Sequence, residues 1–145
     1  MPITLDNVGI VVQDMQETIA FFTDLGLRVL GHDEVGGEWV DTLVGLDDSD
    51  VRLTMLTTPD GRGRLQLVEY LHPEPVPSRP VPSNQAGLHR VAFEVDDIDA
   101  SLAVAARHGC YPVRCVAEHL GLYRLTYVRG PGGIRVMLMQ RLRRD

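Results

Sequence analysis

The stretch LDNVGIVV at residues 5–12 recurs in altered form as LHRVAFEV at residues 88–95, a constant shift of 83 positions (88 minus 5). The match continues without a gap, so that Asp14 falls on Asp97 and Gly26 falls on Gly109. A repeat of this kind indicates two copies of one structural unit. The sequence therefore predicts a fold in which a strand, a helix cap and a helix occur twice in the same order.

Each copy begins with alternating polarity and then changes to helical spacing. Val8, Ile10 and Val12 occupy one face of the first strand, and Val91, Phe93 and Val95 occupy the equivalent face. An Asp suited to N-capping comes next, followed by apolar residues at helical spacing in both copies: Met15, Ile19 and Phe22, then Ile98, Leu102 and Ala105. Both first strands are expected to pack against the helix that follows them.

Three further strands are predicted in each copy, at 28–34, 51–57 and 64–70 and then at 110–115, 122–129 and 134–140. An insert between residues 36 and 50 is expected to hold a short helix over 38–44. A proline-rich linker over about 71–87 separates module one, about 1–70, from module two, about 88–145. We predict one α+β domain of tandem βαβββ modules, with a curved mixed sheet around a cavity and helices on the outer face.

Composition excludes several kinds of function. A formal charge of −6 and a pI near 5.3 argue against a nucleic-acid partner, and the only basic cluster is Arg141, Arg143 and Arg144. All 14 basic residues are arginine, which removes Schiff-base chemistry by lysine. No apolar run approaches the roughly 20 residues that cross a bilayer. We expect a cytoplasmic protein without a membrane partner.

Several segments together resemble one family. These are residues 5–12, FFTDLGL at 21–27, and the turns TPDG at 58–61 and RGPGGI at 129–134. They are similar to the vicinal oxygen chelate superfamily, which includes glyoxalases, bleomycin-resistance proteins and extradiol dioxygenases. The resemblance covers nearly the whole chain. It implies paired βαβββ modules around a cavity in which many relatives hold a divalent metal with His and Glu side chains.

The metal-ligand positions implied by this resemblance hold unsuitable residues. The two positions before the first strands are Asn7 and Arg90, and the two in the last strands are Gln66 and Met137. Amide oxygens are weak donors, a thioether is soft, and a guanidinium repels a metal ion. No metal cofactor is therefore expected, and the four side chains become candidates for contacting a ligand.

A second metal set uses Glu69 and His89, which are neighbours of these positions. The alternation of side chains along a strand argues against this metal set. Gln66 and Glu69 point to opposite faces of a strand, as do Arg90 and His89. A divalent metal at Glu69 and His89 is thus the alternative reading.

Parity also places Arg90 and Glu94 on one face of their strand. As a functional pair, Arg90 would bind a carboxylate or phosphate and Glu94 would act as counter-ion or general base; as a structural pair, they would only neutralise each other. Tyr123 and Tyr127 share a face, and either they or Arg124 and Thr126 face the cavity. Trp39, the only tryptophan, is a further ligand-contact candidate, with core packing as the alternative.

Three functions remain open at this point. The first is metal-independent binding of a small organic molecule. The second is catalysis by a metal-independent isomerase, lyase or hydrolase that uses Arg90 and Glu94 on an anionic substrate. The third is a metal-dependent glyoxalase or dioxygenase. Whether the chain is an enzyme is left undecided, and a homodimer is the expected assembly.

Overall fold

The two predicted first strands lie at the edges of two separate four-stranded sheets. The computed structural model describes residues 1–142, and the chain divides into two compact units, Met1–Pro77 and Ser78–Asp145. In the first unit β1 (Val8–Val11) pairs in parallel with β4 (Arg64–His72). In the second unit β5 (Val91–Glu94) pairs in parallel with β8 (Arg135–Arg141). The predicted duplication is thus present in the strand pairing.

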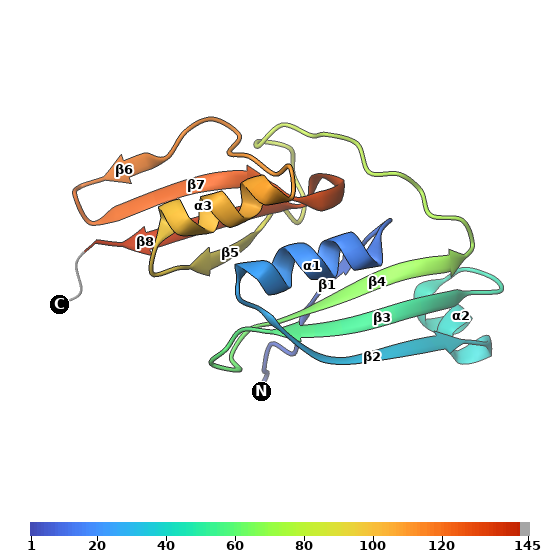
Figure 1. The fold of residues 1–145 in the computed structure, drawn as a ribbon. Coiled ribbons are helices and arrows are strands. Elements are labelled where there is room, and N and C mark those ends of the chain that lie inside the picture. The colour runs from blue at the N-terminus through green and yellow to red at the C-terminus, as the bar shows by residue number, and fades with distance from the viewer. Residues whose placement is uncertain (143–145) are drawn as a thin grey trace. The chain divides into compact units, whose positions relative to one another are not determined.

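The first sheet has the strand order β1-β4-β3-β2, where β2 is Arg28–Gly36 and β3 is Asp50–Thr57. Helix α1 (Met15–Leu25) lies along one face of this sheet (Figure 1) and contacts β2 and β4. The connection between β2 and β3 contains α2 (Glu38–Val44), which confirms the short helix predicted there.

The second sheet has the equivalent order β5-β8-β7-β6, with α3 (Ile98–Arg107) packed on β7 and β8. Strand β7 is Tyr123–Arg129, and a 3-10 turn at Pro131–Gly133 leads into β8. The prediction of a strand at 110–115 is wrong, because β6 is Ala117–His119 and the earlier segment makes one isolated bridge, Pro112 to Val128. Pro112 has no N–H to donate, so a regular ladder does not run through it.

Both long helices begin in the same way. Asp14 Oδ1 accepts a hydrogen bond from Glu17 N at 3.0 Å, and Asp97 Oδ1 accepts one from Ala100 N at 3.0 Å. A side chain of the last strand adds a second acceptor in each unit. Glu69 Oε2 accepts from Met15 N at 3.0 Å, and Gln140 Oε1 accepts from Ile98 N at 2.9 Å. These acceptors satisfy N–H groups that have no partner inside the helix.

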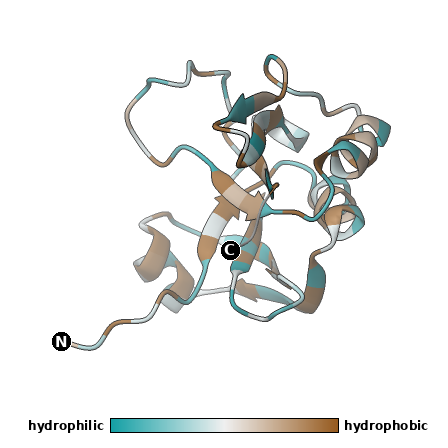
Figure 2. Ribbon diagram, turned by 90° about the vertical axis from the view of Figure 1, so that its left-hand side faces the viewer, coloured by the Kyte–Doolittle hydropathy of each residue, from teal (hydrophilic) through white to brown (hydrophobic). Residues whose placement is uncertain are grey.

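The core of each unit lies between its long helix and the sheet. Leu67 and Leu138 occupy equivalent central positions of β4 and β8 and are 0% and 1% exposed. Apolar and polar positions alternate along the strands, which appear as brown segments separated by white or teal ones (Figure 2). One face of each sheet is therefore buried under its helix, and we call the opposite face the open face.

Two remaining expectations concern the chain as a whole. Among residues 1–142 no helix is long and apolar enough to cross a membrane. Of the basic cluster near the C-terminus, Arg141 ends β8, whereas Arg143 and Arg144 lie outside the described residues.

Candidate functional site

The open face of the second sheet carries the tyrosines. Tyr123, Leu125 and Tyr127 of β7 lie opposite Arg141, Met139 and Met137 of β8 in the antiparallel register. Gln140 reaches the N-terminus of α3, so the alternate residues of β8, including both methionines, point to the other side. Tyr123 and Tyr127 therefore share the open face, and their role as ligand contacts stays a prediction.

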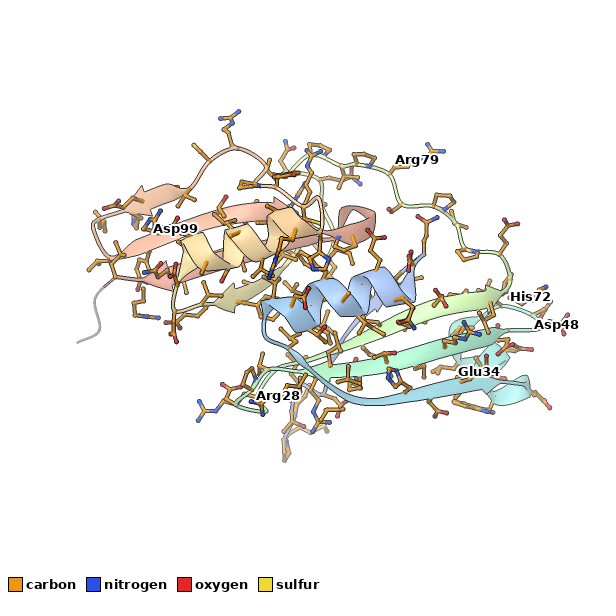
Figure 3. All side chains as sticks on the ribbon, viewed as in Figure 1. Arg28, Glu34, Asp48, His72, Arg79 and Asp99 are labelled. Atoms are coloured by element: carbon orange, nitrogen blue, oxygen red, sulfur yellow. The ribbon has the colours of Figure 1, made fainter. Side chains whose placement is uncertain are left out.

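Arg124 and Thr126 belong to the face covered by α3. Arg124 donates from Nη1 and Nη2 to the two carboxylate oxygens of Asp99, at 2.9 and 3.1 Å, and Asp99 lies in the first turn of α3 (Figure 3). The hydrogen bonds from Arg124 lower the pKa of Asp99. Arg124 thus ties the helix to the sheet.

Three side chains surround the ring of Tyr127. The guanidinium carbon of Arg90 lies 5.5 Å from the ring centroid and that of Arg135 lies 5.9 Å from it. The His89 ring meets Tyr127 edge to face, with 5.5 Å between centroids and 64° between planes. Cations within about 6 Å of an aromatic centroid are attracted by the ring quadrupole. We call His89, Arg90, Tyr127 and Arg135 the Tyr127 cluster.

Arg135 is held in place by hydrogen bonds to neutral acceptors. Its Nη1 lies 3.0 Å from His89 Nδ1 and 3.1 Å from His89 Nε2, and its Nη2 donates to the carbonyl of Val81 at 2.9 Å. Its Nε is buried and has no hydrogen-bond partner among residues 1–142. The guanidinium is therefore fixed and partly desolvated, yet no hydrogen bond or ion pair in the described chain joins it to a carboxylate.

The surroundings of His89 disfavour its charged form. Desolvation lowers the pKa of His89, and the positive charges of Arg135 and Arg90 lower it further. A neutral imidazole has a lone pair that accepts a hydrogen bond from Arg135. His89 is therefore a hydrogen-bond acceptor within the Tyr127 cluster at neutral pH.

We expect His89 to titrate below the ordinary histidine value, and R135Q to raise its pKa because one of the two cations is removed. NMR titration of the imidazole signals measures both values, with R107Q on α3 as the matched control. The folded state binds this proton less readily than the unfolded state. His89 therefore contributes stability above its unfolded pKa, and this contribution is lost as the pH falls toward its folded pKa. An unshifted His89 would contradict this reading.

At the opposite end of the same open face, the charge of Arg141 is balanced by Glu94. Arg141 Nε donates to Glu94 Oε1 at 3.2 Å, Arg141 Nη1 donates to Tyr123 Oη at 3.3 Å, and its guanidinium carbon lies 5.3 Å from the Tyr123 centroid. The predicted Arg90–Glu94 pair is thus replaced by an Arg141–Glu94 pair. The reason is register, because Glu94 lies beside Met139, next to the end of β8, whereas Arg90 precedes β5. Catalysis by Glu94 stays a prediction.

In the first unit the centre of the corresponding open face differs from that of the second unit. Gln66 lies beside Gly9 in the parallel register, and Asn7 comes just before β1. Asn7 Nδ2 donates to Asp6 Oδ2 at 2.7 Å. The neighbouring side chains on this face are Leu53, Met55 and Val68, all half-buried. Gln66 and Met55 thus stand where the second unit has Met137 and Tyr127, whereas Arg64 stands where the second unit has Arg135.

The structure also bears on metal binding. Glu69 lies on the helix-covered face of β4, where it accepts from Met15 N and lies 3.6 Å from Arg52 Nη1. Within residues 1–142 no group of three or more His, Cys, Asp or Glu side chains is arranged to hold a metal ion. Asn7, Gln66, Arg90 and Met137 do not fit a divalent metal of the kind held by His and Glu ligands.

Trp39 lies in α2, in the connection between β2 and β3. It is 61% exposed on α2, where Val40 is the buried residue. Core packing of Trp39, the alternative reading, is therefore wrong. Its role as a ligand contact stays a prediction.

Sequence reasoning missed Arg135 and Arg141 as site residues. The signal was present, because Met137 and Met139 were placed on one face of the last strand. Extending that period of two by one step in each direction gives Arg135 and Arg141. The contact partners of these arginines could not be predicted from the sequence. His89 lies before β5, where side chains no longer alternate between the two faces of a strand.

Comparison with known proteins places this geometry in a family. A family model described as Glyoxalase/Bleomycin resistance protein/Dioxygenase superfamily matches residues 6–121. The uncharacterized protein YaeR of Escherichia coli K12 is 29% identical over 137 residues, which cover 92% of this chain and 93% of YaeR.

Solved structures agree with this match. A glyoxalase family protein from Bacillus cereus is 37% identical, with a TM-score of 0.94 over 99% of this chain and 97% of that one. The genomically encoded fosfomycin resistance protein FosX from Listeria monocytogenes, in complex with Mn(II) and sulfate, has a TM-score of 0.60 at 12% identity. That likeness covers 97% of this chain and 93% of FosX, and it concerns the fold alone.

Proposed function

This chain belongs to the glyoxalase/bleomycin resistance protein/dioxygenase superfamily, and on that premise we propose that it binds a small organic anion without a divalent metal. The binding surface is the open face of the second sheet. The observation that carries the proposal is the position of Arg90 over Tyr127, without a carboxylate partner among the described residues, at a place where the resemblance implies a metal ligand.

The distribution of charge supports an anionic ligand. The first unit has 14 acidic residues and 4 arginines, a formal charge of −10, whereas the second has 6 acidic residues and 10 arginines, a formal charge of +4; together they give the −6 of the chain. A guanidinium binds a carboxylate through two parallel hydrogen bonds. The positive unit is therefore the one suited to an anion.

The apolar part of the ligand is also defined by this face. Met139 and Leu125 are half-buried and lie between the two tyrosines, which are about 13 Å apart along β7, and the half-buried Met137 lies beside Tyr127. Methionine side chains adapt to ligand shape and make favourable contacts with aromatic rings. A planar aromatic body next to a carboxylate matches this arrangement.

The test combines metal analysis with ligand binding. Elemental analysis of the purified protein is expected to show no stoichiometric divalent metal. Calorimetry with benzoate is expected to give the same affinity with and without a chelator, and benzoate should raise the melting temperature. A stoichiometric metal, or benzoate binding that a chelator abolishes, would overturn the metal-free reading. Absence of binding by benzoate and by its dicarboxylate analogues would overturn the proposal as a whole.

A further inference from the structure

The arginines of the second unit differ in how their charge is balanced. Arg124 is bound by Asp99 and Arg141 by Glu94. Arg90 and Arg135, in contrast, share the ring of Tyr127, and neither has an ion pair within residues 1–142. Two cations near one aromatic ring repel each other, and the pKa of the adjacent His89 is lowered by desolvation and by both of these charges. The Tyr127 cluster therefore concentrates positive charge that the described chain does not compensate.

The unused hydrogen-bond donors of Arg90 and Arg135 also point to an anion at the Tyr127 cluster. A guanidinium has five N–H donors. Arg135 uses one at His89 and one at Val81, and its Nε–H is buried without a partner. Each of its two terminal nitrogens keeps one further N–H, and all five of Arg90 are without a protein acceptor among the described residues. The cluster thus offers donors on two separate guanidiniums.

We infer that Arg135 is a second anion-binding residue of this face and that the preferred ligand is an aromatic dicarboxylate. This inference rests on the proposed function and names its ligand class. One carboxylate binds Arg90 and the other binds Arg135, while the ring packs on Tyr127 and Met137. The two guanidinium carbons are at most 11.4 Å apart, the sum of 5.5 and 5.9 Å, which places two carboxylates on one small ring within their reach.

His89 acts as a positioning residue in this arrangement. It holds Arg135 through the contact of 3.0 Å to Nη1, and its ring packs against Tyr127. The opposite end of the face does not offer a third anion site, because Glu94 neutralises Arg141 there. Dicarboxylates are therefore expected to bind at the Tyr127 end alone.

The experiment compares benzoate with phthalate, isophthalate and terephthalate by calorimetry on the full chain. At least one dicarboxylate is expected to bind about tenfold more tightly than benzoate, because a second charged hydrogen bond is formed. R135Q should remove this preference, so that benzoate and the dicarboxylates bind with similar affinity. R141Q, the matched neutralisation at the other end of the face, should keep the preference. R135K keeps the positive charge but loses the planar guanidinium, and it should retain part of the preference for the dicarboxylate.

The outcomes separate the two proposals. If none of the four compounds binds, the proposed function fails. If benzoate binds and no dicarboxylate binds more tightly, the dicarboxylate inference fails alone. It also fails if R135Q, with the melting temperature of the unaltered protein, keeps the preference. The comparison on the unaltered protein decides the matter even where R135Q does not fold.

Discussion

Leu138→Ala is expected to lower the free energy of unfolding by about 2–5 kcal/mol, because it leaves a cavity beneath α3. Leu138 is 1% exposed and lies between Phe93 of β5 and Thr126 of β7 in the second sheet. A closely packed interior relaxes only partly around a lost side chain. The loss of packing therefore adds to the loss of hydrophobic burial, and denaturation by urea measures the sum.

The repeat provides a matched comparison for this prediction. Leu67→Ala makes the same change at the equivalent position of β4, where Leu67 is fully buried between Ile10 and Thr54. A loss of similar size is expected there. Met139→Ala and Val68→Ala, on the half-buried open faces, are expected to cost about 1 kcal/mol. Equal losses at buried and open-face positions would contradict the assignment of the two faces.

Arg90→Glu is expected to weaken benzoate binding by about 10-fold to 150-fold, which corresponds to about 1.5–3 kcal/mol for a hydrogen bond to a charged group. The substituted carboxylate also repels the ligand, so the effect lies toward the upper end of this range. Arg90→Lys keeps the charge but loses the planar, two-pronged geometry, and an intermediate affinity is expected. Calorimetry at fixed ionic strength measures all three proteins.

Arg107→Glu serves as the control for charge reversal. Arg107 is exposed in the last turn of α3, the helix on the opposite face of the sheet, so the change in net charge is the same. Its affinity for benzoate is expected to stay close to that of the unaltered protein. If both reversals weaken binding equally, the effect is one of overall charge, and Arg90 is not the binding residue.

Much of the fold was predictable because it rests on local patterns that occur twice. The capping residues Asp14 and Asp97 and the alternating first strands lie where the repeat places them. The error at residues 110–115 has a local cause as well. An apolar segment was assigned as a strand although Pro112 interrupts its hydrogen-bonding edge.

The site was only partly predictable, because contacts between side chains depend on register between strands. Parity gave the shared face of Arg90, Ala92 and Glu94, but not the position of Arg141 beside Glu94. That contact follows from the pairing of β5 with β8, which a single sequence does not contain. His89 was assigned to the wrong side for a similar reason, since parity holds only inside a strand.

In both units a side chain of the last strand accepts a hydrogen bond from the first turn of the long helix, and this shared contact has an evolutionary consequence. Glu69 and Gln140 hold the first turns of α1 and α3 in the same way, although one side chain is charged and the other is not. After the duplication, selection had to keep only an oxygen acceptor at these two places for both halves to fold. Mutations on the two open faces were then under separate selection. The two open faces then diverged, so that Tyr127 stands where the first unit has Met55 and Arg90 stands where it has Asn7, and two different surfaces arose on one scaffold.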